Sequence, residues 1–309
     1  MKATVIIPTY NRAARLRGLL ECLAHQEGGH LARVVVCDDG SSDETAAVAQ
    51  SFMERLPLVY AFQEDLGFRA GQARNMGVER AIGEVVIFVD DDMLVSPTFV
   101  REHVRAHEGR NAPQCCALGL RYRAGTFEKN VPSTDDILGA ERDDRIADLD
   151  GGSVEEHEAP WTFVYSCNFS VTLGGPELRF DDEFHGWGFE DLELGYRLFH
   201  AGYPIFELKG APVLHIDDPA PRDPFRCEVL ELPPTYDSYV LNFVYFMDKY
   251  PADTALAHIA RNELRWYVES PDGHWVKNGY ENDVEYVIER CRQQLSGHTS
   301  PLQRAQAHT

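Results

Sequence analysis

The apolar positions of the first 122 residues alternate between two periods. Short continuous apolar runs predict buried strands. These runs cover residues 3–8, 33–37, 58–63, 85–89 and 115–122. Between the first two runs, leucines recur at helical spacing and predict a helix over residues 13–26, and a similar pattern predicts a helix over 72–81. Strands separated by single helices indicate right-handed crossovers, so the sequence predicts an α/β fold with a mostly parallel sheet.

The apolar periodicity is lost after residue 122 and returns after residue 160. Residues 123–160 are rich in Asp, Glu and Gly and poor in apolar periodicity, which is typical of a long surface loop or lid. Further predicted strands cover 161–171, 204–208 and 212–216. Predicted helices cover 192–201, 239–249, 255–268 and 284–295. We therefore expect four parts, with bounds 1–122, 123–160, 161–232 and a helical C-terminal extension at 233–309.

Polar clusters follow three of the predicted strands. They are Pro8-Thr9-Tyr10-Asn11, Asp38-Asp39 and Asp90-Asp91-Asp92. Ligands of a parallel α/β sheet bind beyond the carboxyl ends of its strands, where these clusters fall. Three adjacent carboxylates repel one another and become stable together when a hard cation neutralises them. We expect Mg²⁺ or Mn²⁺ at Asp90–Asp92, with a nucleotide beside it.

The composition of the chain argues against two classes of partner, nucleic acid and membrane. The chain has 29 basic and 50 acidic residues, a net charge of -21, so nucleic acid is not expected as a partner. Its seven cysteines form no CxxC pair, which favours reduced thiols in a cytoplasmic protein. No signal peptide precedes the first strand, and no apolar run approaches the ~20 residues of a membrane helix, so no integral membrane contact is expected.

Five blocks carry a family resemblance. They are PTYNR, CDDGSSD, GQARNMG, FVDDDM and GWGFEDLELGYRL, in this order. Over residues 3–217 the chain resembles family 2 glycosyltransferases of the GT-A fold, and its last block is similar to that of chondroitin-type polymerases and galactosyltransferase-like modules. The resemblance implies a Rossmann-like, mostly parallel sheet flanked by helices. It also implies metal-dependent transfer of a sugar from a UDP-sugar.

The resemblance assigns metal roles to three residues. Asp92 is expected to be the direct ligand, Asp90 to contact the ribose or metal-bound water, and His215 to be a further ligand. An acidic turn that caps the next helix is the alternative at Asp90–Asp92, although a cap needs one carboxylate rather than three. A lone histidine is more often structural. The other histidines, His107 and His185 among them, are not expected to form a zinc site.

The resemblance also assigns a nucleotide-sugar site. Its expected residues are Pro8, Thr9, Tyr10, Asn11, Arg12, Asp39, Arg69, Arg74, Asp90 and Asp91. Asp39 would accept a hydrogen bond from uracil, and the arginines would clamp base or phosphate near a helix start. The alternatives are a turn at Asp39, core packing for Tyr10 and surface ion pairs for Arg69 and Arg74.

The last block predicts the acceptor side. Trp187 offers a flat apolar face to a sugar ring and Gly188 lets backbone approach it, so both are expected to bind the acceptor. The resemblance makes Asp191 the catalytic base and Glu190 a ligand of acceptor hydroxyls. A helix dipole lowers the pKa of a carboxylate at its start, so Asp191 needs burial or repulsion from Glu190 to remain a competent base. Simple helix capping is the alternative.

These expectations combine into one hypothesis. A metal-dependent, inverting enzyme would move a hexose or N-acetylhexosamine from a UDP-sugar to a hydroxyl of a glycan or small natural product. The acidic surface favours a neutral or cationic acceptor such as an aminocyclitol. A retaining transferase and a non-catalytic carbohydrate-binding protein are the alternatives, while a nucleotidyltransferase would need a glycine-rich basic loop that Pro8-Thr9-Tyr10-Asn11 does not supply. The C-terminal helices would close over the acceptor or form a homodimer.

Overall fold

The computed structural model describes residues 1–109, 114–142, 152–174, 178–217 and 236–297. Two compact units divide the chain. The first comprises Met1–Asp65, Arg69–Asp182 and Glu190–Asp218, and the second comprises Leu66–Phe68, Glu183–Phe189 and Pro219–Thr309. The expected boundary at 232/233 and part of the acidic segment, 143–151, lie outside the described residues.

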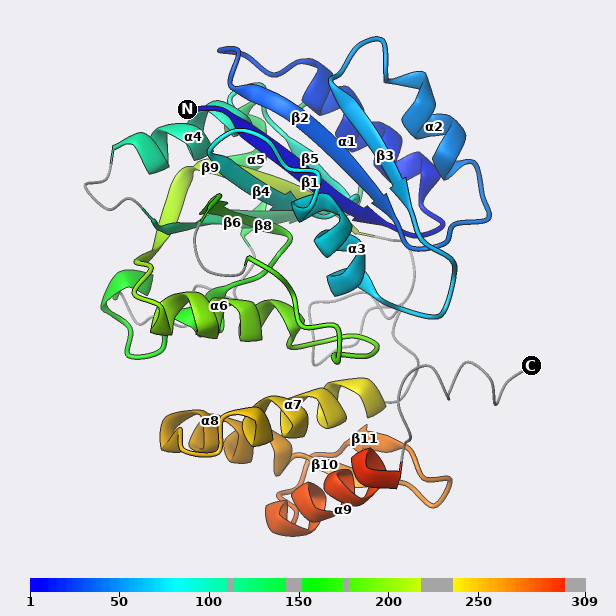
Figure 1. Ribbon diagram of the computed structural model, residues 1–309, viewed down its shortest axis with the longest axis vertical. Coiled ribbons are helices and arrows are strands. Elements are labelled where there is room, and N and C mark those ends of the chain that lie inside the picture. The colour runs from blue at the N-terminus through cyan, green and yellow to red at the C-terminus, as the bar shows by residue number, and fades with distance from the viewer. Residues whose placement is uncertain (110–113, 143–151, 175–177, 218–235, 298–309) are drawn as a thin grey trace. The chain divides into compact units, whose positions relative to one another are not determined.

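The first unit is built on one large sheet (Figure 1), with strand order β3-β2-β1-β4-β8-β6-β9-β5 and β7 paired to β6. Its strands are β1 Ala3–Thr9, β2 Leu31–Asp38, β3 Leu58–Phe62, β4 Val85–Val89, β5 Met93–Val95, β6 Cys116–Ala124, β7 Glu141–Arg142, β8 Asn168–Thr172 and β9 Ile205–Ile216. Strands β3, β2, β1 and β4 run parallel, as do β6 and β9, while β8 and β5 run antiparallel to their neighbours. The predicted α/β class with a largely parallel sheet is confirmed.

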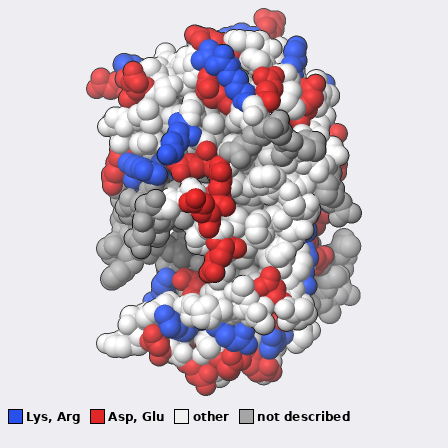
Figure 2. Space-filling model, turned by 90° about the vertical axis from the view of Figure 1, so that its left-hand side faces the viewer, with Lys and Arg blue, Asp and Glu red and all other residues white. Residues whose placement is uncertain are grey.

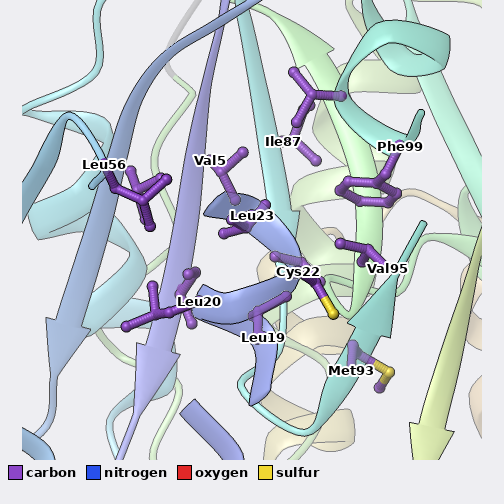
Figure 3. Close-up of a cluster of buried hydrophobic side chains, with 14 of the residues drawn as sticks. Val5, Leu19, Leu20, Cys22, Leu23, Leu56, Ile87, Met93, Val95 and Phe99 are labelled. Atoms are coloured by element: carbon purple, nitrogen blue, oxygen red, sulfur yellow. The ribbon is translucent and has the colours of Figure 1, made fainter. Parts of the chain in front are cut away.

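Helices flank this sheet. They are α1 Ala13–Ala24, α2 Thr45–Ser51, α3 Ala70–Val78, α4 Phe99–Glu108, α5 Thr134–Leu138 and α6 Glu190–His200, with 3₁₀ turns at Val154–Glu156 and Pro160–Phe163. The alternation of strand side chains sends Val5 and Ile87 to the face covered by Leu20 and Leu23 of α1, where they form a buried cluster (Figure 3). This packing fixes α1 and the loop before it against the strand ends.

Helix α3 packs closely on the opposite face. A Cβ at Gly77 would lie 2.4 Å from Cγ2 of Ile6 and 2.9 Å from Sγ of Cys37, so a side chain here would push the helix away from β1 and β2. Because Gly77 allows this approach, Arg74, three residues earlier on α3, is held near the carboxyl ends of those strands.

Three local predictions were wrong. Residues 160–163 form a 3₁₀ turn that starts at a proline, so the strand predicted over 161–171 is limited to Asn168–Thr172. The strands predicted at 204–208 and 212–216 are one strand, β9, which continues past Pro212 through a register shift opposite Gly119 and Arg121. Sequence periodicity misses such joins because the bulge is set by the neighbouring strand.

The described part of the second unit carries α7 Asp237–Lys249, α8 Thr254–Leu264 and α9 Val284–Gly297. Its helical character was predicted, but it also holds a two-stranded antiparallel sheet of β10 Tyr267–Glu269 and β11 Trp275–Lys277. The helix predicted over 255–268 therefore ends early. In the described part of the chain, no helix is both long enough and apolar enough to cross a membrane.

Two histidines of α4 are buried in the core. His103 and His107 stand four residues apart, the HxxxH spacing that zinc ligands on one face of a helix share. Their rings are engaged in the core: Oγ of Ser170 lies 2.8 Å from Nδ1 of His103 and 2.9 Å from Nε2 of His107. Burial lowers the pKa of His103 to about 3, so this ring is neutral and serves the packing of α4 on β8.

Candidate active site

The polar clusters predicted at three strand ends meet at one edge of the sheet. Thr9, the last residue of β1, pairs in register with Asp38 at the end of β2. The hydroxyl of Thr9 donates to Oδ2 of Asp91 at 2.6 Å, and the backbone N–H of Asp39 donates to the carbonyl of Thr9 at 2.9 Å. The parallel order β2-β1-β4 brings these ends together.

A second strand pairing brings His215 to the aspartates. Strand β5 runs antiparallel to β9 with Met93 opposite His215. This register places Nε2 of His215 3.3 Å from Oδ2 of Asp92. On its other side, Nδ1 of His215 lies 3.1 Å from Oδ1 of Asp217, and that carboxylate accepts two hydrogen bonds from the buried Arg123. The imidazole is therefore held by a buried ion pair, which fixes its orientation.

The neighbouring carboxylates Asp91 and Asp92 differ in their ionisation. Burial and the charge of Asp92 raise the pKa of Asp91 to about 8. Burial also opposes ionisation of Asp92, but the hydrogen bond and charge of His215, together with Arg12, hold its pKa below the ordinary value. Nη1 of Arg12 lies 2.7 Å from Oδ2 of Asp92 and 3.6 Å from Oδ1 of Asp91. The site thus favours a cation beside Asp92.

The donor set at Asp92 fits a hard divalent metal. Its Oδ1 is buried without a hydrogen-bond partner, so one ligand oxygen is unused. The 3.3 Å between Asp92 and His215 resembles the spacing of adjacent ligands on one ion with bonds of about 2.1 Å. No three His, Cys, Asp or Glu side chains in the described residues form a complete metal cluster. Substrate phosphates and water would therefore have to supply the remaining ligands, as Mg²⁺ sites commonly require.

Asp38 and Asp39 divide the two roles that the sequence left open. Oδ1 of Asp38 accepts from the backbone N–H groups of Gly40 and Ser41, so Asp38 stabilises the turn. Asp39 instead accepts from Nε2 of Gln63 at 2.5 Å and from the backbone N–H of Arg69 at 2.7 Å. Its pKa is raised, chiefly by burial. Asp39 is therefore held beyond the end of β2 by residues from two later segments.

The segment after β1 is exposed at its tip. Tyr10 is 45% exposed and its hydroxyl donates to Oδ2 of Asp65, so the core-packing alternative is wrong. Asn11 adopts φ 52°, and its side-chain oxygen accepts from the N–H of Ser42 at 2.8 Å. Asparagine tolerates this left-handed conformation better than most residues. Pro8 lies within β1 and is buried.

Arg74 joins the predicted donor and acceptor sides. It is buried, and its guanidinium donates to Oδ1 of Asp90 at 3.0 Å and to Oε1 of Glu190 at 3.2 Å. The surface ion-pair alternative is therefore wrong for Arg74. Burial and then the charge of Asp191 raise the pKa of Glu190 to about 7, with Arg74 opposing the shift.

Arg69 packs beside Asp39, with Nη2 of Arg69 3.5 Å from Oδ1 of Asp39.

Asp191 stands at the first turn of α6. Its Oδ2 accepts from the backbone N–H of Ser166 at 3.2 Å, and its Oδ1 accepts from the N–H of Leu192 at 2.9 Å. Burial raises its pKa, which is the compensation that a base at a helix start requires. Trp187 and Gly188 belong to the second compact unit and are described with it below.

Comparison with known proteins gives the family. Residues 4–159, just over half of the 309-residue chain, match the model of "Glycosyl transferase family 2". The chain belongs to this family. The match includes the Asp39 turn, Arg74 and Asp90–Asp92, and it ends before His215 and Asp191.

One similar curated relative is the validoxylamine A glucosyltransferase of Streptomyces hygroscopicus subsp. jinggangensis. It is 35% identical over 225 residues, which cover 65% of this chain and 52% of the relative. The chain therefore spans about half the length of that protein.

Solved structures of glycosyltransferases share the fold. The Staphylococcus aureus TarS fragment 1–349 in complex with UDP-GlcNAc is 18% identical, with a TM-score of 0.60 over 86% of this chain and 72% of that chain. Mannosyltransferase PcManGT from Pyrobaculum calidifontis, in complex with GDP-Man and Mn²⁺, is 16% identical, with a TM-score of 0.53 over 99% of this chain and 79% of that one. At this identity the likeness shows the GT-A fold.

Sequence reasoning missed several supporting residues. Arg123 and Ser166 belong to no motif, yet they hold Asp217 and Asp191. Gln63 lies at the end of a predicted strand without any pattern that marks it. Only the strand order brings these side chains to the site, so no sequence signal could have identified them.

Proposed function

We propose that this family 2 protein transfers a hexose or N-acetylhexosamine from a UDP-sugar to a hydroxyl group, with inversion at the anomeric carbon. The observation that carries the proposal is the Arg74 bridge. One guanidinium ties Asp90, beside the candidate metal ligand Asp92, to Glu190, beside the candidate base Asp191. In this proposal, the donor and acceptor chemistry share one charge network around the buried guanidinium of Arg74.

The donor nucleotide would dock on the strand ends of the first unit. Asp39 would accept a hydrogen bond from the N3–H of uracil, with Thr9 and the exposed Tyr10 beside the base. Gln63 and Arg69 already hold the Asp39 carboxylate in place, so little ordering is needed on binding. The TarS fragment that shares the fold was solved with UDP-GlcNAc, which supports the choice of nucleotide.

Asp92 and His215 would hold Mg²⁺ or Mn²⁺, with Asp90 close to the ribose or to a metal-bound water. The ion would offset negative charge on the leaving diphosphate. Arg12 now lies 2.7 Å from Asp92 and would turn to phosphate oxygens as the site loads. Asp217 and Arg123 would keep His215 aimed at the ion.

Asp191 would act as the base in a single displacement. The acceptor oxygen forms a bond to the anomeric carbon and gives its proton to Asp191. The bond from that carbon to the diphosphate oxygen breaks, and UDP leaves with the electron pair. Glu190 would hold neighbouring acceptor hydroxyls, and the raised pKa of Asp191 makes it a stronger base than a free aspartate.

A small neutral or cationic acceptor fits the charge of the surface. Acidic side chains gather in a patch on the face shown in Figure 2. An anionic polymer would be repelled by such a patch, whereas an amine would be attracted. A glucosyltransferase named for validoxylamine A is among the relatives, which supports a small-molecule acceptor such as an aminocyclitol.

Release of UDP from a panel of UDP-sugars tests the proposal. Each donor is incubated with validoxylamine A or glucosamine as acceptor, in Mn²⁺, in Mg²⁺ and in EDTA. We expect metal-dependent release from one donor, and loss of that release in Asp92→Ala. Glu141→Gln, an exposed carboxylate on β7, is the matched control. Release that persists in EDTA or in Asp92→Ala would contradict the metal role, and no release with any donor and acceptor would contradict the proposed function.

A further inference from the structure

We propose that α7 positions the acceptor-binding loop, and that Tyr239 on this helix sets the orientation of Trp187. The loop is defined here as residues 185–189, His-Gly-Trp-Gly-Phe. The inference rests on the proposed function and on the acceptor role that the sequence predicts for Trp187. It gives the C-terminal extension, which the family match does not reach, a role different from the closure or homodimer expected from the sequence. Loop and helix both lie in the second compact unit.

Two side chains of α7 bind the backbone of the loop. The buried amide of Asn242 donates to the carbonyl oxygen of His185 at 3.0 Å and to that of Gly188 at 2.9 Å. Oγ of Ser238 accepts from the N–H of Trp187 at 3.1 Å and lies 3.2 Å from the carbonyl oxygen of the same residue. Four backbone groups on three loop residues are thus satisfied by α7, as a loop folded onto a helix requires.

The loop backbone is shaped to lie against α7. Gly186 has φ 70° and Gly188 has φ 110°, conformations that favour glycine. A Cβ at Gly186 would lie 2.5 Å from Cβ of Ser238, and one at Gly188 would lie 3.2 Å from Cδ2 of Tyr239. The two glycines are therefore required by contact with the helix as well as by backbone conformation.

Phe189 shows the same dependence. It adopts φ 73° although it is not glycine, a conformation that costs of order 1 kcal/mol or more. Its ring stacks on Phe243 of α7, with centroids 4.0 Å apart, and contacts Tyr239 at 4.7 Å. Packing on α7 therefore offsets the strain in the last residue of the loop.

The indole of Trp187 is stacked on Tyr239. Their centroids are 5.4 Å apart and their planes differ by 20°. This contact with α7 fixes the plane of the ring before any ligand arrives. Trp187 is half-buried, and we infer that the exposed part of its indole contacts the apolar face of a pyranose or cyclitol ring, which a pre-oriented aromatic ring binds at lower entropic cost.

The test compares Tyr239→Leu, which removes the aromatic ring, with Tyr239→Phe, which keeps it. With the best donor and validoxylamine A as the probe acceptor, Tyr239→Leu should raise the acceptor KM about three- to tenfold, the loss expected for one aromatic stack. Its Kd for UDP and its acceptor-independent hydrolysis of the donor should stay at the wild-type values. Tyr239→Phe should match the wild type in all three measurements.

Amide exchange provides a readout that does not depend on turnover. In Asn242→Asp, loss of the two donated hydrogen bonds should speed exchange across residues 183–189. The control Asp248→Asn, which breaks the α7 ion pair with Arg292, should not change exchange there. Unchanged exchange in Asn242→Asp, an unchanged acceptor KM in Tyr239→Leu or an equal loss of UDP affinity would each overturn the inference. If the wild-type protein shows no turnover while exchange in Asn242→Asp is faster as expected, the proposed function is contradicted and the inference about α7 is not.

Discussion

Arg74 on α3 and Glu190 on α6 form a buried ion pair across 116 residues of sequence, with Nη1 of Arg74 3.2 Å from Oε1 of Glu190. The same guanidinium holds Asp90 at 3.0 Å. A planar guanidinium can serve two carboxylates at fixed directions, whereas an ammonium group acts as a single point charge. Replacing Arg74 should therefore disturb both carboxylates at once.

Arg74→Lys should lower kcat by at least about tenfold, because lysine cannot hold both carboxylates in one geometry. Arg74→Ala should cost roughly 3–5 kcal/mol of stability, since it leaves the buried carboxylate of Glu190 without its partner. Steady-state kinetics and thermal unfolding measure the two effects. Arg80→Ala, at an exposed position, should leave both at wild-type values. An Arg74→Lys enzyme with wild-type kcat would show that the network is only structural.

Asp191→Asn should lower turnover by about 10²–10⁴-fold, the range for loss of a general base. Its affinity for UDP should hold, because the hydrogen bonds that Asp191 accepts among the described residues come from Ser166 and Leu192 and not from the strand-end residues of the nucleotide site. Isothermal titration with UDP and single-turnover kinetics separate binding from chemistry. Weakened UDP binding in this variant would argue that Asp191 belongs to the donor site.

Activity should rise with pH as Asp191, the candidate base, loses its proton. Burial raises the pKa of Asp191, so this carboxylate keeps its proton to a higher pH than a free aspartate does. The activity therefore increases as Asp191 ionises. Glu190→Gln removes a neighbouring negative charge and should move the limb to lower pH, as seen in kcat/KM measured from pH 5 to 9. If the rising part of the pH profile does not shift in Glu190→Gln, it reports the ionisation of another group.

The raised pKa of Glu190 predicts a stability change of opposite sense. The ordinary pKa of glutamate is 4.5 and the folded value for Glu190 is about 7, so the fold favours the protonated form. The stabilisation is full below the ordinary value and is lost as the pH rises through 7. Urea unfolding at pH 5 and pH 8 should show that Glu190→Gln retains more of its stability at pH 8 than the wild type does.

His215→Ala should weaken Mn²⁺ binding by more than about tenfold, the scale seen when groups that hold a metal are altered. Electron paramagnetic resonance of Mn²⁺ with UDP measures this without turnover. His25→Ala, at an exposed histidine on the same unit, is the control. Wild-type Mn²⁺ affinity in His215→Ala would restrict the metal site to the aspartates.

The product should carry the anomeric configuration opposite to that of the donor sugar, because one base and one displacement invert the carbon. Proton NMR of the isolated glycoside gives the answer from a single coupling constant. Retention would favour the retaining alternative and would remove Asp191 from the role of base.

The homodimer through the C-terminal helices and the cytoplasmic location also stay predictions.

The sequence by itself determined the elements that depend on local periodicity and the polar residues at the ends of β1, β2 and β4. These features are local, because strand period, crossover handedness and the polar residues at strand ends each depend on residues that are close together in the sequence. The sequence alone was therefore enough to propose Asp39 and Asp90–Asp92 as candidate site residues.

Tertiary structure alone decided which of these residues meet. The β5–β9 pairing brings His215 to Asp92, and the close approach of α3 to β1 lets Arg74 reach Glu190. It also decided that Trp187 stacks on Tyr239 of the C-terminal extension. Such contacts join segments far apart in the chain. Their contribution to the free energy of folding depends on strand order, register and burial. No local pattern of residues encodes these quantities.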